Sequence, residues 1–65
     1  MKIFSKSLIN TLTIKGKVIL LYDFKNKYKC IVMENNQIIS IDYSDKKHYK
    51  DINDYVFQIK NKFEI

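Results

Sequence analysis

The chain has 65 residues, a mass of 7.8 kDa and a formal charge of +5, so it has room for one small domain and not for a second core. A single cysteine excludes an internal disulfide, and a hydrophobic content of 46% is too high for a disordered chain. The longest apolar run, residues 18–22, is far shorter than the ~20 residues of a membrane-spanning helix, and no signal-peptide cleavage site follows the N-terminus. We therefore expect a single cytoplasmic domain with no membrane partner.

The first fifteen residues fit two kinds of element. In a strand, the two faces of this segment would hold Leu8, Asn10, Leu12 and Ile14 in alternation with Ile9, Thr11, Thr13 and Lys15, and the threonines and isoleucines there favour that interpretation. Phe4, Leu8 and Leu12 also recur at helical spacing. We expect a strand in this segment, with a helix as the fallback.

Three apolar runs follow, at residues 17–24, 28–34 and 37–43, and each is separated from the next by turn-forming residues. Asn35-Asn36 suits a two-residue hairpin turn, because asparagine tolerates the positive φ that such a turn requires. Residues 25–27 fit a three-residue loop. These connections predict a small antiparallel β-meander of three or four strands.

The predicted register divides the side chains between two faces of this sheet. Pairing Phe24 with Tyr28, and Val32 with Ile39, places only apolar and aromatic residues on one face, which we expect to form the core. That face holds Leu20, Tyr22, Phe24, Tyr28, Cys30, Val32, Ile39, Ile41 and Tyr43. The other face holds a second apolar cluster, Ile19, Leu21, Ile31, Met33 and Ile38, beside a charged row of Asp23, Lys29 and Asp42.

The spacing changes after residue 43. Apolar residues then recur every three or four positions, at Tyr49, Ile52, Val56, Ile59 and Phe63, which predicts an amphipathic helix. Asp45 or Asp51 is expected to cap its start. The predicted fold is α+β, a sheet covered on one face by this C-terminal helix, in the order β-β-β-β-α, or α-β-β-β-α if the fallback holds.

The second apolar cluster predicts an interaction surface. If residues 1–9 do not cover Ile19, Leu21, Ile31, Met33 and Ile38, this cluster is exposed, and exposed patches of this kind usually mark a protein interface. The occupant is then either a foreign protein or a further copy of the chain, as a homodimer or higher oligomer.

Charge is concentrated in the first half of the chain. Residues 1–33 hold seven lysines against one acidic residue, and five of these lysines flank the expected turns: Lys15, Lys17, Lys25, Lys27 and Lys29. They are candidates for contacting an acidic partner or nucleic-acid phosphates. Lysines in turns also keep small domains soluble, and an AT-rich coding bias enriches lysine as well. The absence of arginine argues against base-specific reading of DNA.

No arrangement of residues indicates catalysis, a metal or a cofactor. One histidine, His48, and one cysteine, Cys30, are too few for a structural zinc site. Cys30 is expected in the core as an inert thiol. His48 among lysines is compatible with a small ribonuclease, but no second acid or base is placed beside it, so a solvated residue at the helix start is the better interpretation.

We therefore expect a non-enzymatic binding protein without cofactors. Its size and residue bias are generally like those of small phage and mobile-element proteins, which suggests an inhibitor that occupies a surface of a host defence or nucleic-acid-processing protein. The alternative is a sheet-based nucleic-acid or nucleotide binder that uses lysine–phosphate contacts. A small toxin-like ribonuclease is the weaker alternative.

Overall fold

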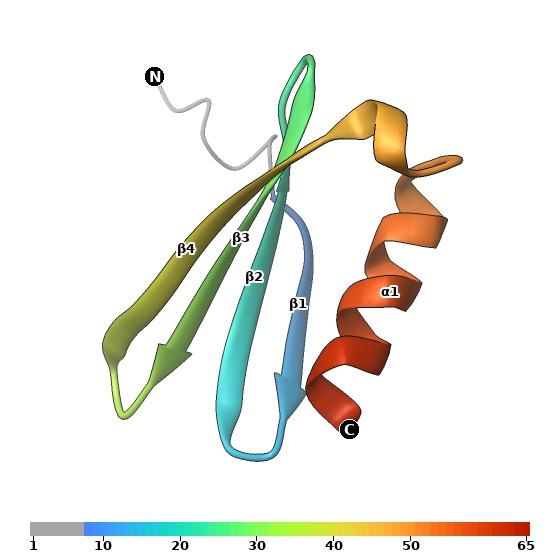
Figure 1. Cartoon of the computed structure of the whole chain (residues 1–65). Helices are drawn as coiled ribbons and strands as arrows, with labels where there is room; N and C mark the ends of the chain where they lie inside the picture. The colour runs from blue at the N-terminus through green and yellow to red at the C-terminus, as the bar shows by residue number, and fades with distance from the viewer. Residues whose placement is uncertain (1–7) are drawn as a thin grey trace.

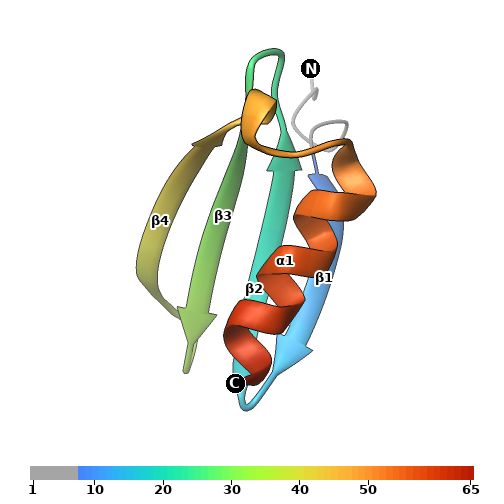
Figure 2. The same cartoon turned by 45° about the vertical axis from the view of Figure 1, so that its right-hand side comes forward.

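The computed structural model describes residues 8–65. It contains β1 (Leu8–Ile14), β2 (Lys17–Asp23), β3 (Lys27–Glu34), β4 (Gln37–Asp45), a short 3-10 helix η2 (Lys46–His48) and α1 (Ile52–Glu64) (Figure 1). The four strands form one antiparallel sheet in sequence order, and α1 lies over one face of it, closest to β1 and β2 (Figure 2). The predicted α+β order, β-β-β-β-α, is confirmed.

The strand interpretation of the N-terminal segment is correct for residues 8–14, so the α-β-β-β-α fallback does not apply there. The alternative in which residues 1–9 cover the second face falls largely outside the described residues. Within residues 8–65, no helix combines the length and the apolar character needed to cross a membrane.

Two tight turns depend on residues with positive φ. Asn35 and Asn36 have φ of 55° and 64°, and they join Glu34 to Gln37 in the predicted two-residue hairpin. Lys15 and Gly16 have φ of 52° and 81° between β1 and β2, where glycine adopts this conformation without steric cost. Asparagine and glycine thus close both hairpins with the backbone twist that antiparallel strands need.

The predicted pairing of β2 with β3 is wrong by one residue. Only Lys25 and Asn26 form the connection, because the Phe24 N–H donates to the Lys27 carbonyl at 2.9 Å, whereas the sequence suggested a three-residue loop. Asp23, and not Phe24, therefore pairs with Tyr28. Side chains alternate between the two faces of a strand, so this shift moves every residue of β2 to the opposite face.

The pairing of β3 with β4 begins as predicted and then shifts. Met33 pairs with Ile38, but Val32 pairs with Ser40, which leaves Ile39 as the extra residue of a β-bulge. Beyond the bulge, Ile31 pairs with Ile41, whereas the predicted partner of Ile41 was Cys30. Strand β4 therefore turns serine and aspartate side chains towards the α1 side and its isoleucines away from it.

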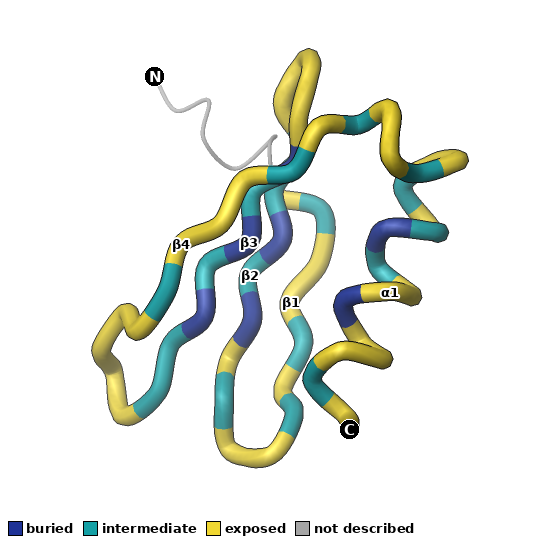
Figure 3. The backbone as a smooth tube through the Cα atoms, viewed as in Figure 1, coloured by how far each residue is buried: buried dark blue, intermediate teal, exposed yellow. Residues whose placement is uncertain are grey.

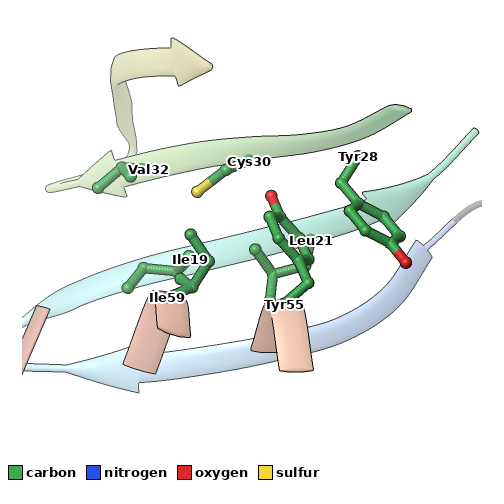
Figure 4. Close-up of a cluster of buried hydrophobic side chains, with 7 residues drawn as sticks. All are labelled: Ile19, Leu21, Tyr28, Cys30, Val32, Tyr55 and Ile59. Atoms are coloured by element: carbon green, nitrogen blue, oxygen red, sulfur yellow. The ribbon is translucent and has the colours of Figure 1, made fainter. Parts of the chain in front are cut away.

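The core lies between the sheet and α1, and its buried members are Ile19, Leu21, Tyr28, Cys30, Val32, Tyr55 and Ile59 (Figure 4). In Figure 3 the buried stretches accordingly follow β2, β3 and α1, while β4 is mostly exposed. Core positions predicted for Tyr28, Cys30 and Val32 are confirmed. Those predicted for Leu20, Tyr22, Phe24, Ile39, Ile41 and Tyr43 are wrong because of the two register shifts.

Aromatic rings fill the end of the core beside η2. The rings of Tyr28 and Tyr55 stack with centroids 4.2 Å apart, and Tyr49 packs edge-on against both, at 5.8 and 5.0 Å. Lys46 lies over the Tyr28 ring and forms an ion pair with Asp23. The predicted charged row of Asp23, Lys29 and Asp42 is wrong, because Asp23 and Asp42 lie on the α1 side of the sheet and Lys29 lies on the opposite side.

Aspartates cap both helices. The Asp51 carboxylate accepts a hydrogen bond from the Asp54 N–H at 2.9 Å at the start of α1, and Asp45 accepts one from the Lys47 N–H at 3.0 Å at the start of η2. The Asp54 carboxylate in turn accepts from the Lys50 N–H at 3.0 Å, and this bond lowers the pKa of Asp54. These contacts fix where the chain leaves the sheet and begins to cross its face.

Candidate binding surface on the outer face of the sheet

The outer face is the side of the sheet turned away from α1. Cross-strand pairing aligns Leu20, Ile31 and Ile41 in one row, and Val18, Met33 and Ile38 in the next, with Ile39 beside them in the bulge. Among the β4 members, Ile38, Ile39 and Ile41 are 55%, 50% and 48% exposed. The described part of the chain thus leaves a continuous apolar surface in contact with solvent across three strands.

The predicted interface is partly corrected by this geometry. Ile31, Met33 and Ile38 do lie on the outer face. Ile19 and Leu21 are 0% exposed and belong to the core under α1, so their prediction as interface residues is wrong. Leu20 and Val18 take their places, because the pairing of β2 with β3 is shifted by one residue. A role in binding for Ile31, Met33 and Ile38 stays a prediction.

Aromatic and lysine side chains are interleaved at the end of the outer face nearest the β2–β3 connection. The rings of Tyr22 and Phe24 stack with centroids 6.4 Å apart. The Lys29 ammonium lies 5.8 Å from the Tyr22 centroid and 5.6 Å from that of Tyr43, and Lys27 lies 4.9 Å from Tyr43. We call Tyr22, Phe24, Tyr43, Lys25, Lys27 and Lys29 the aromatic–lysine end.

An open groove occupies part of this end. It has a volume of about 500 Å³ and is lined by Phe24, Lys25, Asn26, Lys27 and Tyr43. Tyr43 is 56% exposed and Phe24 is 36% exposed, so both rings present surface to the groove and to solvent. Because sequence reasoning assigned these rings to the core, it missed them as contact residues. A two-residue connection at Lys25-Asn26 would have placed Phe24 correctly, whereas Tyr43 also required the bulge at Ile39.

The five candidate lysines do not form one site. Lys25, Lys27 and Lys29 surround the aromatic–lysine end. Lys15 and Lys17 lie at the opposite end of β2, as the meander predicted, and the Lys15 ammonium donates to the Ile65 backbone oxygen at 2.9 Å. Any single ligand of the outer face would therefore meet the first three lysines and not the last two.

Residues with catalytic or metal-binding chemistry lie apart from this surface. Cys30 is buried under α1, and burial raises the pKa of its thiol, which keeps the sulfur uncharged at neutral pH. His48 is exposed at the end of η2. Residues 8–65 contain no group of three or more His, Cys, Asp or Glu side chains placed to hold a metal ion.

The outer face, with the aromatic–lysine end at its border, is suited to binding a partner by surface contact. It offers apolar area for a buried centre, aromatic rings for stacking and ammonium groups at one border. No family model, curated protein or solved structure matches the chain.

Proposed function

We propose that this chain is a non-enzymatic binding protein that docks on an acidic partner protein through the outer face and acts by occupying that partner's surface, as an inhibitor does. The observation that supports this proposal is the exposed apolar surface formed by β2, β3 and β4. Small monomeric proteins rarely expose a contiguous apolar patch of more than a few hundred Å², and larger patches usually mark contact sites.

The charges beside this patch fit the same role. Lys25, Lys27 and Lys29 stand at one border of the outer face, and a border of like charge accelerates encounter with an oppositely charged partner. The apolar centre then supplies most of the contact that persists in the complex. We therefore expect salt to slow association more than it speeds dissociation.

Affinity capture with matched variants tests the proposal. Ile41→Glu places a carboxylate among the exposed isoleucines of β4 on the outer face, whereas Phe57→Glu makes the same charge change on α1, where Phe57 is 61% exposed. We expect the wild type and Phe57→Glu to capture the same proteins after nuclease treatment, and Ile41→Glu to capture none of them. Equal capture by all three forms, or capture of nothing, would contradict the proposal.

A second candidate function is the binding of single-stranded nucleic acid, and the aromatic–lysine end specifically favours it. Aromatic rings on open sheets stack on bases, while nearby ammonium groups contact phosphates. Here Tyr22, Phe24 and Tyr43 are the available rings. If three lysines contact phosphates, the logarithm of the binding constant should fall with the logarithm of the salt concentration with a slope of about −2.

Fluorescence anisotropy with a labelled oligothymidine distinguishes this candidate from protein binding. Lys27→Gln should weaken binding and flatten the salt slope, and Tyr43→Ala should weaken binding at every salt concentration. Lys60→Gln, on the exposed surface of α1, removes the same charge and serves as the control. Binding that is insensitive to salt, or equally weakened by Lys27→Gln and Lys60→Gln, would exclude this function.

A further inference from the structure

A second cleft lies on the opposite side of the sheet from the outer face, where β3 and β4 extend past α1. Its volume is about 230 Å³. The lining residues are Cys30, Asp42, Ser44, Tyr49, Tyr55, Gln58, Ile59 and Lys62. Neither the proposed protein contact nor the nucleic-acid alternative uses any of them.

Strand β4 has polar side chains on the α1 side, where a strand that faces a core normally has apolar ones. Its residues on the α1 side are Ser40, Asp42 and Ser44, which pair with the buried Val32, Cys30 and Tyr28. Its isoleucines point the other way. The apolar side chains of β3 therefore form the floor of the cleft. The polar side chains of β4 form one wall, and α1 forms the other wall.

The two walls carry opposite charges. Asp42 projects from β4 and Lys62 from the last turn of α1. Neither takes part in an ion pair within residues 8–65. Besides burial, the main influences on the pKa of the Cys30 thiol are Lys62, which lowers it, and Asp42, which raises it, so both charges act on the same sulfur between them.

The floor of the cleft holds a hydroxyl without a partner. Tyr55 is 0% exposed, and its ring rises from α1 so that the hydroxyl points towards β3 near Cys30 (Figure 4). No hydrogen-bond partner for this oxygen exists among the described residues. Buried polar atoms are nearly always hydrogen-bonded, so an isolated one beside a polar cleft indicates a missing partner.

We propose that this cleft binds a small zwitterionic molecule of the size of a free α-amino acid, with its carboxylate towards Lys62 and its ammonium group towards Asp42. The volume of about 230 Å³ is sufficient for such a molecule. Ser44 lies beside Asp42 to accept or donate a further hydrogen bond. A ligand atom that reaches the Tyr55 hydroxyl would supply the partner that this oxygen lacks among the described residues.

Amide-resolved NMR titration tests this inference. Free L-amino acids are added one at a time at millimolar concentration, and the expected result is that at least one shifts the amides of the cleft residues in a saturable way. Lys62→Gln should weaken that binding about tenfold or more, because it removes a charge-assisted contact. Lys60→Gln, two residues away and outside the cleft, should leave the affinity unchanged.

Asp42→Asn gives a second arm, because it keeps the shape of an edge-strand side chain while removing the charge. It should also weaken binding about tenfold or more, with an unchanged spectrum elsewhere. The inference is overturned if no amino acid shifts the cleft amides, if the shifts map to the outer face, or if Lys60→Gln and Lys62→Gln weaken binding equally. The capture and anisotropy experiments concern the other face, so their failure leaves this result unaffected.

Discussion

Two neighbouring leucines in β2 give the sharpest test of which side chains of this strand face α1. Leu21 pairs with Cys30 and is 0% exposed beneath α1. Leu20 pairs with Ile31 and lies half-buried on the outer face. Because the two positions share chemistry and strand, truncating each to alanine isolates the effect of the face on which it lies.

The expected costs differ severalfold. Leu21→Ala removes a fully buried side chain and leaves a cavity that the tyrosine rings and Ile19 cannot fill, which typically costs about 2–5 kcal/mol. At Leu20 water replaces the lost atoms, so we expect about 1 kcal/mol. A domain of this length has a total stability of about 3–10 kcal/mol, so Leu21→Ala should remove a large part of it.

Urea denaturation followed by circular dichroism measures both costs. A urea dependence of about 1 kcal/mol per molar turns the expected difference into a midpoint separation of more than 1 M. Leu20→Ala should retain a cooperative transition close to that of wild type. If Leu20→Ala instead costs more than Leu21→Ala, the register in which Leu20 faces the core is correct. If the two cost the same, Leu20 is buried as deeply as Leu21 and the outer face is covered.

Three further outcomes are expected. Tyr55→Phe should raise the free energy of unfolding by about 1 kcal/mol in thermal denaturation, because it removes a buried hydroxyl that has no partner among the described residues. A loss of stability would show that the hydroxyl is hydrogen-bonded. Asp51→Ala should cost about 1 kcal/mol by the same assay through loss of the cap on α1, while Asp51→Asn retains it; equal effects would argue against capping. Hydrogen bonds from the Lys50 N–H and then from Gln58 lower the pKa of Asp54 below its ordinary value of 3.8. The ionised Asp54 carboxylate therefore stabilises the fold above about pH 4, and this stabilisation is lost as the pH falls through the lowered pKa. Acid titrations of Asp54→Asn should accordingly show a shallower loss of stability below pH 4, and a slope identical to wild type would refute this assignment.

Local signals in the sequence were sufficient to predict the order of the elements. The spacing of Ile52, Val56, Ile59 and Phe63 identifies a helix without knowledge of its neighbours. Asn35-Asn36 determines a hairpin through its backbone preference alone. Each of these features is decided within a few residues, so no long-range information is needed.

The register could not be predicted in the same way. Residues 18–22 of β2 are apolar at every position, so alternation does not say which side faces the core. The shift arises from a single hydrogen bond, Phe24 to Lys27, that shortens a connection by one residue. The bulge at Ile39 has no glycine or other residue that signals it in advance.

The candidate surface inherited the same error. A second apolar face was predicted, to be exposed unless residues 1–9 cover it, and Ile31, Met33 and Ile38 lie on it, but the residues from β2 were exchanged for their neighbours. The polar α1 side of β4 was not anticipated either. In the predicted register Ile39, Ile41 and Tyr43 would have closed the space that the second cleft occupies.

The bulge at Ile39 also bears on how copies of the chain can associate. Strand β4 is the last in the sheet, and within residues 8–65 no strand pairs with the backbone groups along its free edge. An uninterrupted edge of such isoleucine-rich sequence would template further strands and favour fibrils. The extra residue breaks the even repeat of amides and carbonyls and increases the local twist, so extension of the sheet by another molecule is opposed along this border. Aggregation by edge growth is therefore disfavoured even though the strand itself is strongly apolar.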